Sequence, residues 1–122
     1  MKVSLDDKYS LATGRAYMTG IEALVRLPIL QHQRDLKRGL NTACFISGYR
    51  GSPIGGLDQA LWKAKKFTDA HNIHFLPGVN EDLAMTSVWA ASRSACFPGQ
   101  STTVFTVCGT ARGLVSIAVW TY

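Results

Sequence analysis

The sequence predicts an α/β fold in which helices pack on a parallel β-sheet. Residues 43–46 form a short, continuously apolar run, which is typical of a strand buried on both faces, and residues 73–76 indicate a second apolar strand. Segments with the spacing of amphipathic helices precede, separate and follow these runs. Because helices and buried strands alternate along the chain, we expect them to form one α/β layer around a parallel sheet.

The first helix is predicted to begin at Gly20, after an irregular lead-in over residues 1–14. Its apolar positions share one helical face: Ile21, Leu24, Val25 and Leu27. Pro28 lacks an N–H group and clashes with the preceding turn, so we expect it to kink or restart the helix. The helical pattern resumes over residues 30–36 and ends at Gly39, a residue type favoured just after helices.

Two further helices are predicted. A glycine-rich loop, residues 48–56, leads into the second helix, which ends near Asn72. One face of that helix is apolar: Leu57, Ala60, Leu61, Ala64 and Phe67. The third helix begins after Asn80, a favourable N-cap residue, with Glu81 and Asp82 in its first turn, and closes at residues 97–99.

Composition excludes several protein classes. With 122 residues, 47% of them hydrophobic, the chain has the size of one domain and is too apolar for a disordered protein. No apolar stretch reaches the roughly 18 residues of a membrane-spanning helix, and the charged N-terminus lacks the apolar core of a signal peptide. The three cysteines are odd in number and widely spaced, which argues against disulfides and against a metal or iron–sulfur site here. We expect a cytoplasmic protein with no membrane association.

The formal net charge of +5 raises the question of nucleic-acid binding. The basic residues gather in two clusters on predicted helices: Arg26, Arg34, Lys37 and Arg38, and then Lys63, Lys65 and Lys66. Because both clusters fall on the polar faces of amphipathic helices, we expect solvated surfaces and no nucleic-acid partner.

Two loops are candidate functional segments because each follows a predicted strand. In parallel sheets ligands bind beyond the carboxyl ends of the strands. Gly51, Ser52 and the glycines after them could present backbone N–H groups to an anion, or could simply form a tight turn into the next helix. The loop matches neither common nucleotide-binding motif. From spacing alone, Glu81 is an acid in the first turn of a helix, and the three histidines lack metal-ligand spacing.

Three segments carry a resemblance to a known family: GIEALVRLP (residues 20–28), GYRGSPIGGLD (48–58) and PGVNEDLA (77–84). They resemble the N-terminal part of indolepyruvate ferredoxin oxidoreductase, in its large fused bacterial form. The resemblance implies that residues 1–99 are a partial pyrimidine-binding domain of a thiamine-diphosphate enzyme, which is a three-layer α/β fold with a parallel sheet. The family oxidatively decarboxylates aryl 2-oxo acids, acylates CoA and reduces ferredoxin.

The same resemblance implies roles for individual residues. Glu81 corresponds to the glutamate that faces the N1′ nitrogen of the cofactor's aminopyrimidine ring and acts in catalysis. Gly51 and Asn80 are implied to help bind the cofactor. A separate set is implied to meet the substrate carboxylate: Tyr49, Arg50 and Ser52.

The resemblance covers only half of a cofactor site. The diphosphate- and Mg²⁺-binding domain, the iron–sulfur cluster motifs and the CoA region of the family have no counterpart here. Thiamine sites are built between two domains, commonly across a dimer, so we expect a homo-oligomeric full-length enzyme and little activity from this chain alone. A non-catalytic α/β interaction or ligand-binding module is the alternative.

Residues 100–122 fall outside the resemblance. Codons for a family-like continuation, shifted by one base, can encode the residues from Gln100 onward, so we interpret this tail as a frameshift product. The nucleotide sequence of the gene tests this interpretation. Taken at face value, residues 104–107 and 114–120 indicate two further strands.

Overall fold

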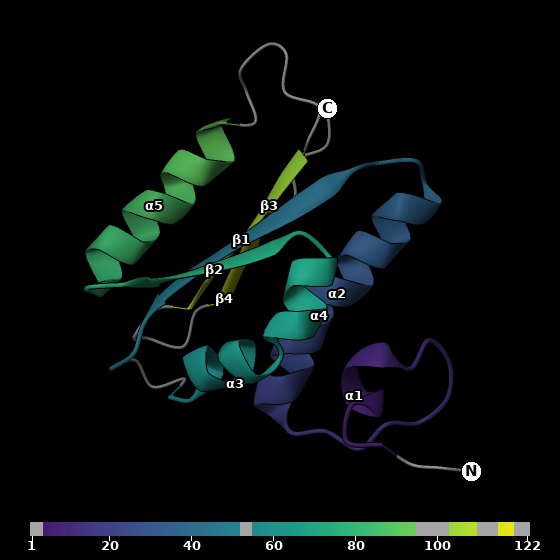
Figure 1. Cartoon of the computed structure of the whole chain (residues 1–122). Helices are drawn as coiled ribbons and strands as arrows, with labels where there is room; N and C mark the ends of the chain where they lie inside the picture. Colours follow the sequence, from purple (N-terminus) through teal and green to yellow (C-terminus); the bar gives the residue numbers. More distant parts are fainter. Residues whose placement is uncertain (1–3, 52–54, 95–102, 110–114, 119–122) are drawn as a thin grey trace.

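A computed structural model describes residues 4–51, 55–94, 103–109 and 115–118. It shows an α/β fold, as the sequence predicts (Figure 1). The helices are α1 (Asp7–Ser10), α2 (Gly20–Lys37), α3 (Leu57–Lys63), α4 (Lys65–Ala70) and α5 (Glu81–Ser94). The strands are β1 (Thr42–Tyr49), β2 (Ile73–Gly78), β3 (Thr103–Gly109) and β4 (Val115–Ala118). No helix in these ranges is long and apolar enough to cross a membrane.

The four strands form one sheet in the order β2-β1-β3-β4. β1 pairs in parallel with β2 on one side and with β3 on the other, which confirms the parallel sheet expected for the first strands. β4 is different, because it runs antiparallel to β3. Only five residues separate β3 from β4, and a parallel crossover needs a connection about twice as long.

Helices cover both faces of the sheet. α5 lies on one face, and α2, α3 and α4 lie on the other (Figure 1). The strand order explains this division, because the chain moves outward from β1 to β2 and then returns across β1 to β3. Crossovers between parallel strands are right-handed, so a reversal of direction places the next helix on the opposite face.

α2 is one continuous helix, so of the two outcomes expected at Pro28, a kink or a restart, the restart is wrong. Thr19, which the sequence reading did not single out, caps α2 in a capping box with Glu22. A proline inside a helix costs roughly 3 kcal/mol. Val25 and Ile29 lie on either side of Pro28 and are fully buried, and burial of each contributes about 1.5–3 kcal/mol. Packing therefore keeps the helix intact.

Two other predicted elements differ from the structure. The lead-in is not wholly irregular, since α1 forms there and buries Tyr9 against Phe67, with the ring centroids 5.4 Å apart. The predicted second helix is divided into α3 and α4 at Ala64, whose backbone leaves helical geometry. Leu61 before this bend, Ala64 at the bend and Thr68 after it are all buried, so tertiary packing sets the break.

The predicted helix ends at Gly39 and Asn72 are confirmed. Both residues have positive φ, 77° and 53° respectively, which is the conformation that ends helices. The core lies between β1 and the helices on the α2 side of the sheet. Its buried members are Tyr9, Val25, Ile29, Cys44, Ile46, Leu61, Ala64 and Ile73.

Candidate functional site

The two candidate loops meet at one edge of the sheet. Tyr49, the last residue of β1, pairs in register with Gly78, the last residue of β2. Because these neighbouring strands are parallel, the segments that follow them begin at the same edge of the sheet, and they then diverge toward α3 and α5 (Figure 1). The expectation that both loops lie at the carboxyl edge is confirmed. β1 also lies between β2 and β3, where the chain reverses direction, and ligands of open α/β sheets bind at such points.

The start of α5 packs tightly on the end of β2. A Cβ atom added to Gly78 would lie 2.7 Å from the Cβ of Ala84 and 3.0 Å from the carbonyl oxygen of Asn80. Only glycine allows this approach, so Gly78 fixes the place where α5 begins. The predicted N-cap is confirmed, because the Asn80 side-chain oxygen accepts a hydrogen bond of 2.8 Å from the Leu83 N–H group.

Glu81 is the first residue of α5 and is half-buried. Its carboxylate has no hydrogen bond or ion pair to the described residues, unlike that of Glu22. Exposed apolar side chains belong to the same strand end and helix start: Leu76, Val79 and Leu83. Within the described residues, Glu81 is thus an acid without a protein partner, on a segment that also carries exposed apolar side chains.

Arg50 forms an ion pair with Asp58, a residue that the sequence does not single out. Its Nε donates to the Asp58 carboxylate over 2.7 Å, and Asp58 lies in the first turn of α3. The Arg50 side chain is 75% exposed, whereas that of Asp58 is 12% exposed. The ion pair uses Nε, and the terminal nitrogens of the guanidinium group have no partner among the residues that the structure describes. Asp58 is the last residue of the GYRGSPIGGLD segment. Its pairing with Arg50 could not be predicted, because the two residues are eight positions apart across a loop and no repeating pattern relates them.

Of the other two substrate-binding candidates, the structure describes Tyr49 but not Ser52. Tyr49 is 40% exposed, and its ring folds over Gly51, where an added Cβ atom would overlap the ring. Gly51 therefore leaves room for the tyrosine above the loop. Ser52 lies outside the described residues. The structure thus brings Tyr49, Arg50 and Gly51 to the same edge as Asn80 and Glu81.

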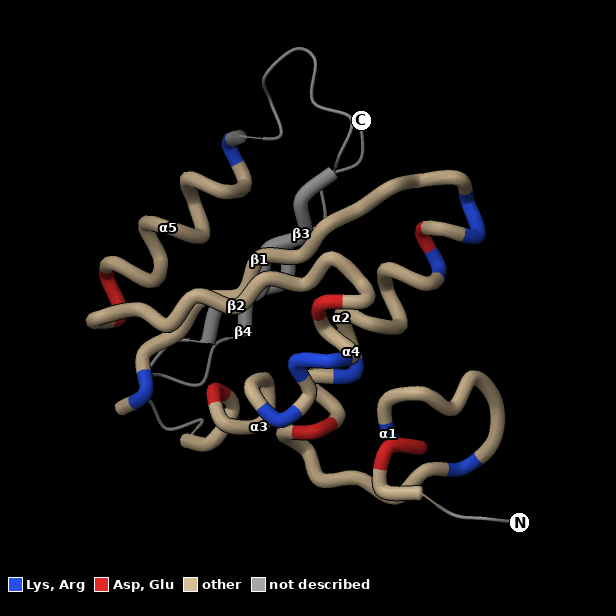
Figure 2. Tube along the Cα trace, viewed as in Figure 1, with Lys and Arg blue, Asp and Glu red and all other residues tan. Residues whose placement is uncertain are grey.

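The basic residues mostly occupy exposed helix surfaces, as predicted (Figure 2). Arg26 is the exception, because its guanidinium group donates to the carbonyl oxygens of Lys8 and Leu11. His32 and His71 lie near each other, with ring centroids 5.4 Å apart. No group of three potential metal ligands occurs among the residues that the structure describes.

Compared with known proteins, the chain has no significant match to a family model, to a curated protein or to a solved structure.

Proposed function

We propose that this chain supplies the pyrimidine-binding half of the thiamine-diphosphate site in a 2-oxoacid:ferredoxin oxidoreductase of the indolepyruvate type. The observation that carries the proposal is the pairing of Tyr49 with Gly78, which brings the Arg50 loop and Glu81 to one edge of the sheet. The resemblance of the three sequence motifs supplies the reaction. The fold is the pyrimidine-binding form of the α/β class, extended by further domains in the complete enzyme.

The surroundings of Glu81 fit an aminopyrimidine ring. The carboxyl group is free of protein partners in the described part of the chain, so it is available to hydrogen-bond a ring nitrogen. Leu76, Val79 and Leu83 are exposed and offer apolar surface on which a flat ring can pack. When bound, thiamine diphosphate supplies the carbon nucleophile that adds to the 2-oxo acid. The role of Glu81 is to hold a proton at the ring nitrogen.

Arg50 is suited to the substrate carboxylate. Asp58 holds the Nε of Arg50, so the free end of the guanidinium group can form a fork toward an anion at the sheet edge. Gly51 and Tyr49 adjoin Arg50 in the chain, and the carboxamide N–H groups of Asn80 remain available as donors after capping. In this proposal, Mg²⁺, the iron–sulfur clusters, CoA and ferredoxin bind to other domains of a cytoplasmic homo-oligomer.

The proposal is tested in the complete enzyme, produced from the gene with its reading frame restored downstream of residue 99. Glu81→Gln removes the acid and keeps the shape, while Asp82→Asn, one residue along in α5, is the matched control. We expect 2-oxoacid-dependent reduction of ferredoxin to fall about 10²–10⁴-fold in Glu81→Gln and to stay near wild type in the control. Equal turnover in both variants would contradict the proposal and favour a non-catalytic α/β module.

A further inference from the structure

A cavity lies apart from Glu81, beside the N-terminal segment. It has a volume of about 280 Å³ and lies between the N-terminal segment, the start of α2 and helices α3 and α4. Tyr9, Ile21, Ala60 and Phe67 give it an apolar lining. Its size is just below the usual range for drug-sized ligands, so it suits a smaller molecule.

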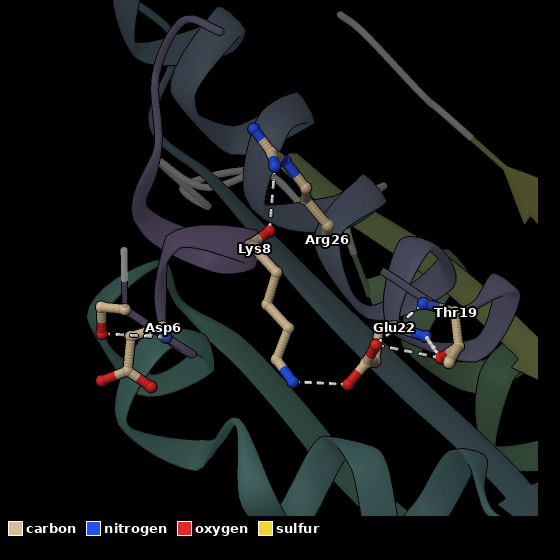
Figure 3. A network of polar contacts seen from close by, with 6 residues as sticks. Asp6, Lys8, Thr19, Glu22 and Arg26 are labelled. Carbon is tan, nitrogen blue, oxygen red and sulfur yellow. Dashed lines mark hydrogen bonds and ion pairs between the residues drawn. The ribbon is translucent and has the colours of Figure 1, made fainter. Parts of the chain in front are cut away.

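The wall formed by the N-terminal segment is fastened to α2 by two side chains (Figure 3). Arg26 donates to the carbonyl oxygens of Lys8 at 3.0 Å and Leu11 at 2.6 Å. Lys8 donates in turn to Glu22, whose other carboxylate oxygen accepts from Thr19. Because each of these groups is satisfied, the wall is fixed by contacts within the chain and needs no ligand to form.

Two other charged side chains at the cavity form no such hydrogen bond or ion pair with the described residues. Asp6, on the N-terminal segment, and Lys63, the last residue of α3, both line the cavity and are exposed. Neither has an ion pair or a side-chain hydrogen bond to the described residues, and no dashed line reaches the Asp6 carboxylate in Figure 3. Among the described residues, the cavity therefore offers one negative and one positive group without a hydrogen bond or ion pair, from different elements, beside an apolar lining. The charge of Asp6 also acts on the Lys8 ammonium group.

We propose that this cavity binds a small zwitterion, namely an α-amino acid with an apolar side chain. The ammonium group pairs with Asp6, the carboxylate pairs with Lys63, and the side chain packs on Tyr9 and Phe67. A ligand with a single charge would satisfy only one of the two free groups. The Lys8–Glu22 pair is neutral as a unit, so the cavity favours neither an anion nor a cation overall.

The test is a chemical-shift titration of the isotope-labelled full chain with three probes of one skeleton: L-leucine, isocaproate and isoamylamine. L-Leucine carries both charges, and each of the other probes lacks one of them. We expect shifts at Tyr9 and Phe67 with L-leucine, with a dissociation constant on the order of 1 mM, and binding about fivefold weaker for each analogue. Equal binding of the three probes, or no binding of L-leucine, would overturn the proposal.

Exposed-residue variants locate the site. Asp6→Asn and Lys63→Met should each weaken L-leucine binding about fivefold, the upper end of the contribution of an exposed ion pair. Lys66→Met is the matched control, because Lys66 is exposed on α4 and does not line the cavity. An equal loss in all three variants would place binding elsewhere. The experiment uses no thiamine diphosphate, so its result is independent of the proposed function.

Discussion

Gly78 and Ala84 approach each other so closely that no side chain fits between the end of β2 and the first turn of α5. This contact sets where α5 leaves the sheet, and therefore where Glu81 lies relative to the Tyr49–Arg50 loop. The candidate site thus depends on a backbone approach as much as on the side chains that carry its chemistry.

The first prediction concerns this approach. Gly78→Ala forces a methyl group against Ala84, so the free energy of unfolding should fall by about 1–3 kcal/mol, as is typical of overpacking. Gly20→Ala is the control, because nothing lies within 4 Å of a Cβ atom at Gly20 and alanine is the better helix former. Chemical denaturation of both variants measures the difference. Equal stability of the two would show that α5 does not pack on β2 in this way.

The ion pair between Glu22 and Lys8 predicts an acid dependence. The Lys8 ammonium and then the Thr19 N–H group hold the pKa of Glu22 at about 2, below its ordinary value of 4.5. The stabilisation is therefore present above about pH 4.5 and is lost as the pH falls toward 2. Melting temperatures recorded over this window should fall less steeply for Glu22→Gln than for the wild type. Parallel curves would mean that the pair does not form.

His32 predicts a second dependence, nearer neutral pH. Burial, and then the neighbouring His71, lower the pKa of His32 below 6.5, and neither ring nitrogen has a hydrogen-bond partner in the described structure. The folded chain therefore resists protonation, and stability should decrease as the pH falls below about 6.5. His32→Leu should remove this slope at little cost, because an apolar group replaces an unpaired polar one. A slope retained in the variant would assign it to another group.

Cys44 gives a test of the core. Burial raises the pKa of its thiol to about 12, so almost no thiolate is present near neutral pH. We expect an alkylating reagent to leave the Cys44 peptide unmodified in the native chain and to modify it fully in denaturant, as measured by mass spectrometry. Rapid native labelling would show that β1 is not the buried centre of the sheet.

The sequence predicts the parts of the structure that depend on local pattern. Parallel strands share their carboxyl edge, so the meeting of the Arg50 loop and Glu81 could be expected from two apolar runs alone. The continuity of α2 at Pro28 and the break at Ala64 could not, because both are set by burial against distant residues. The same holds for Arg50–Asp58 and Lys8–Glu22, whose partners are separated by eight and fourteen positions with no repeating pattern.

The most direct test of the central claim is the structure of the frame-restored enzyme with thiamine diphosphate bound. The account predicts that the Glu81 carboxyl group lies within hydrogen-bond distance, about 2.6–3.2 Å, of the N1′ nitrogen of the aminopyrimidine ring. A bound cofactor whose ring is met by another residue, with Glu81 turned toward solvent, would contradict it.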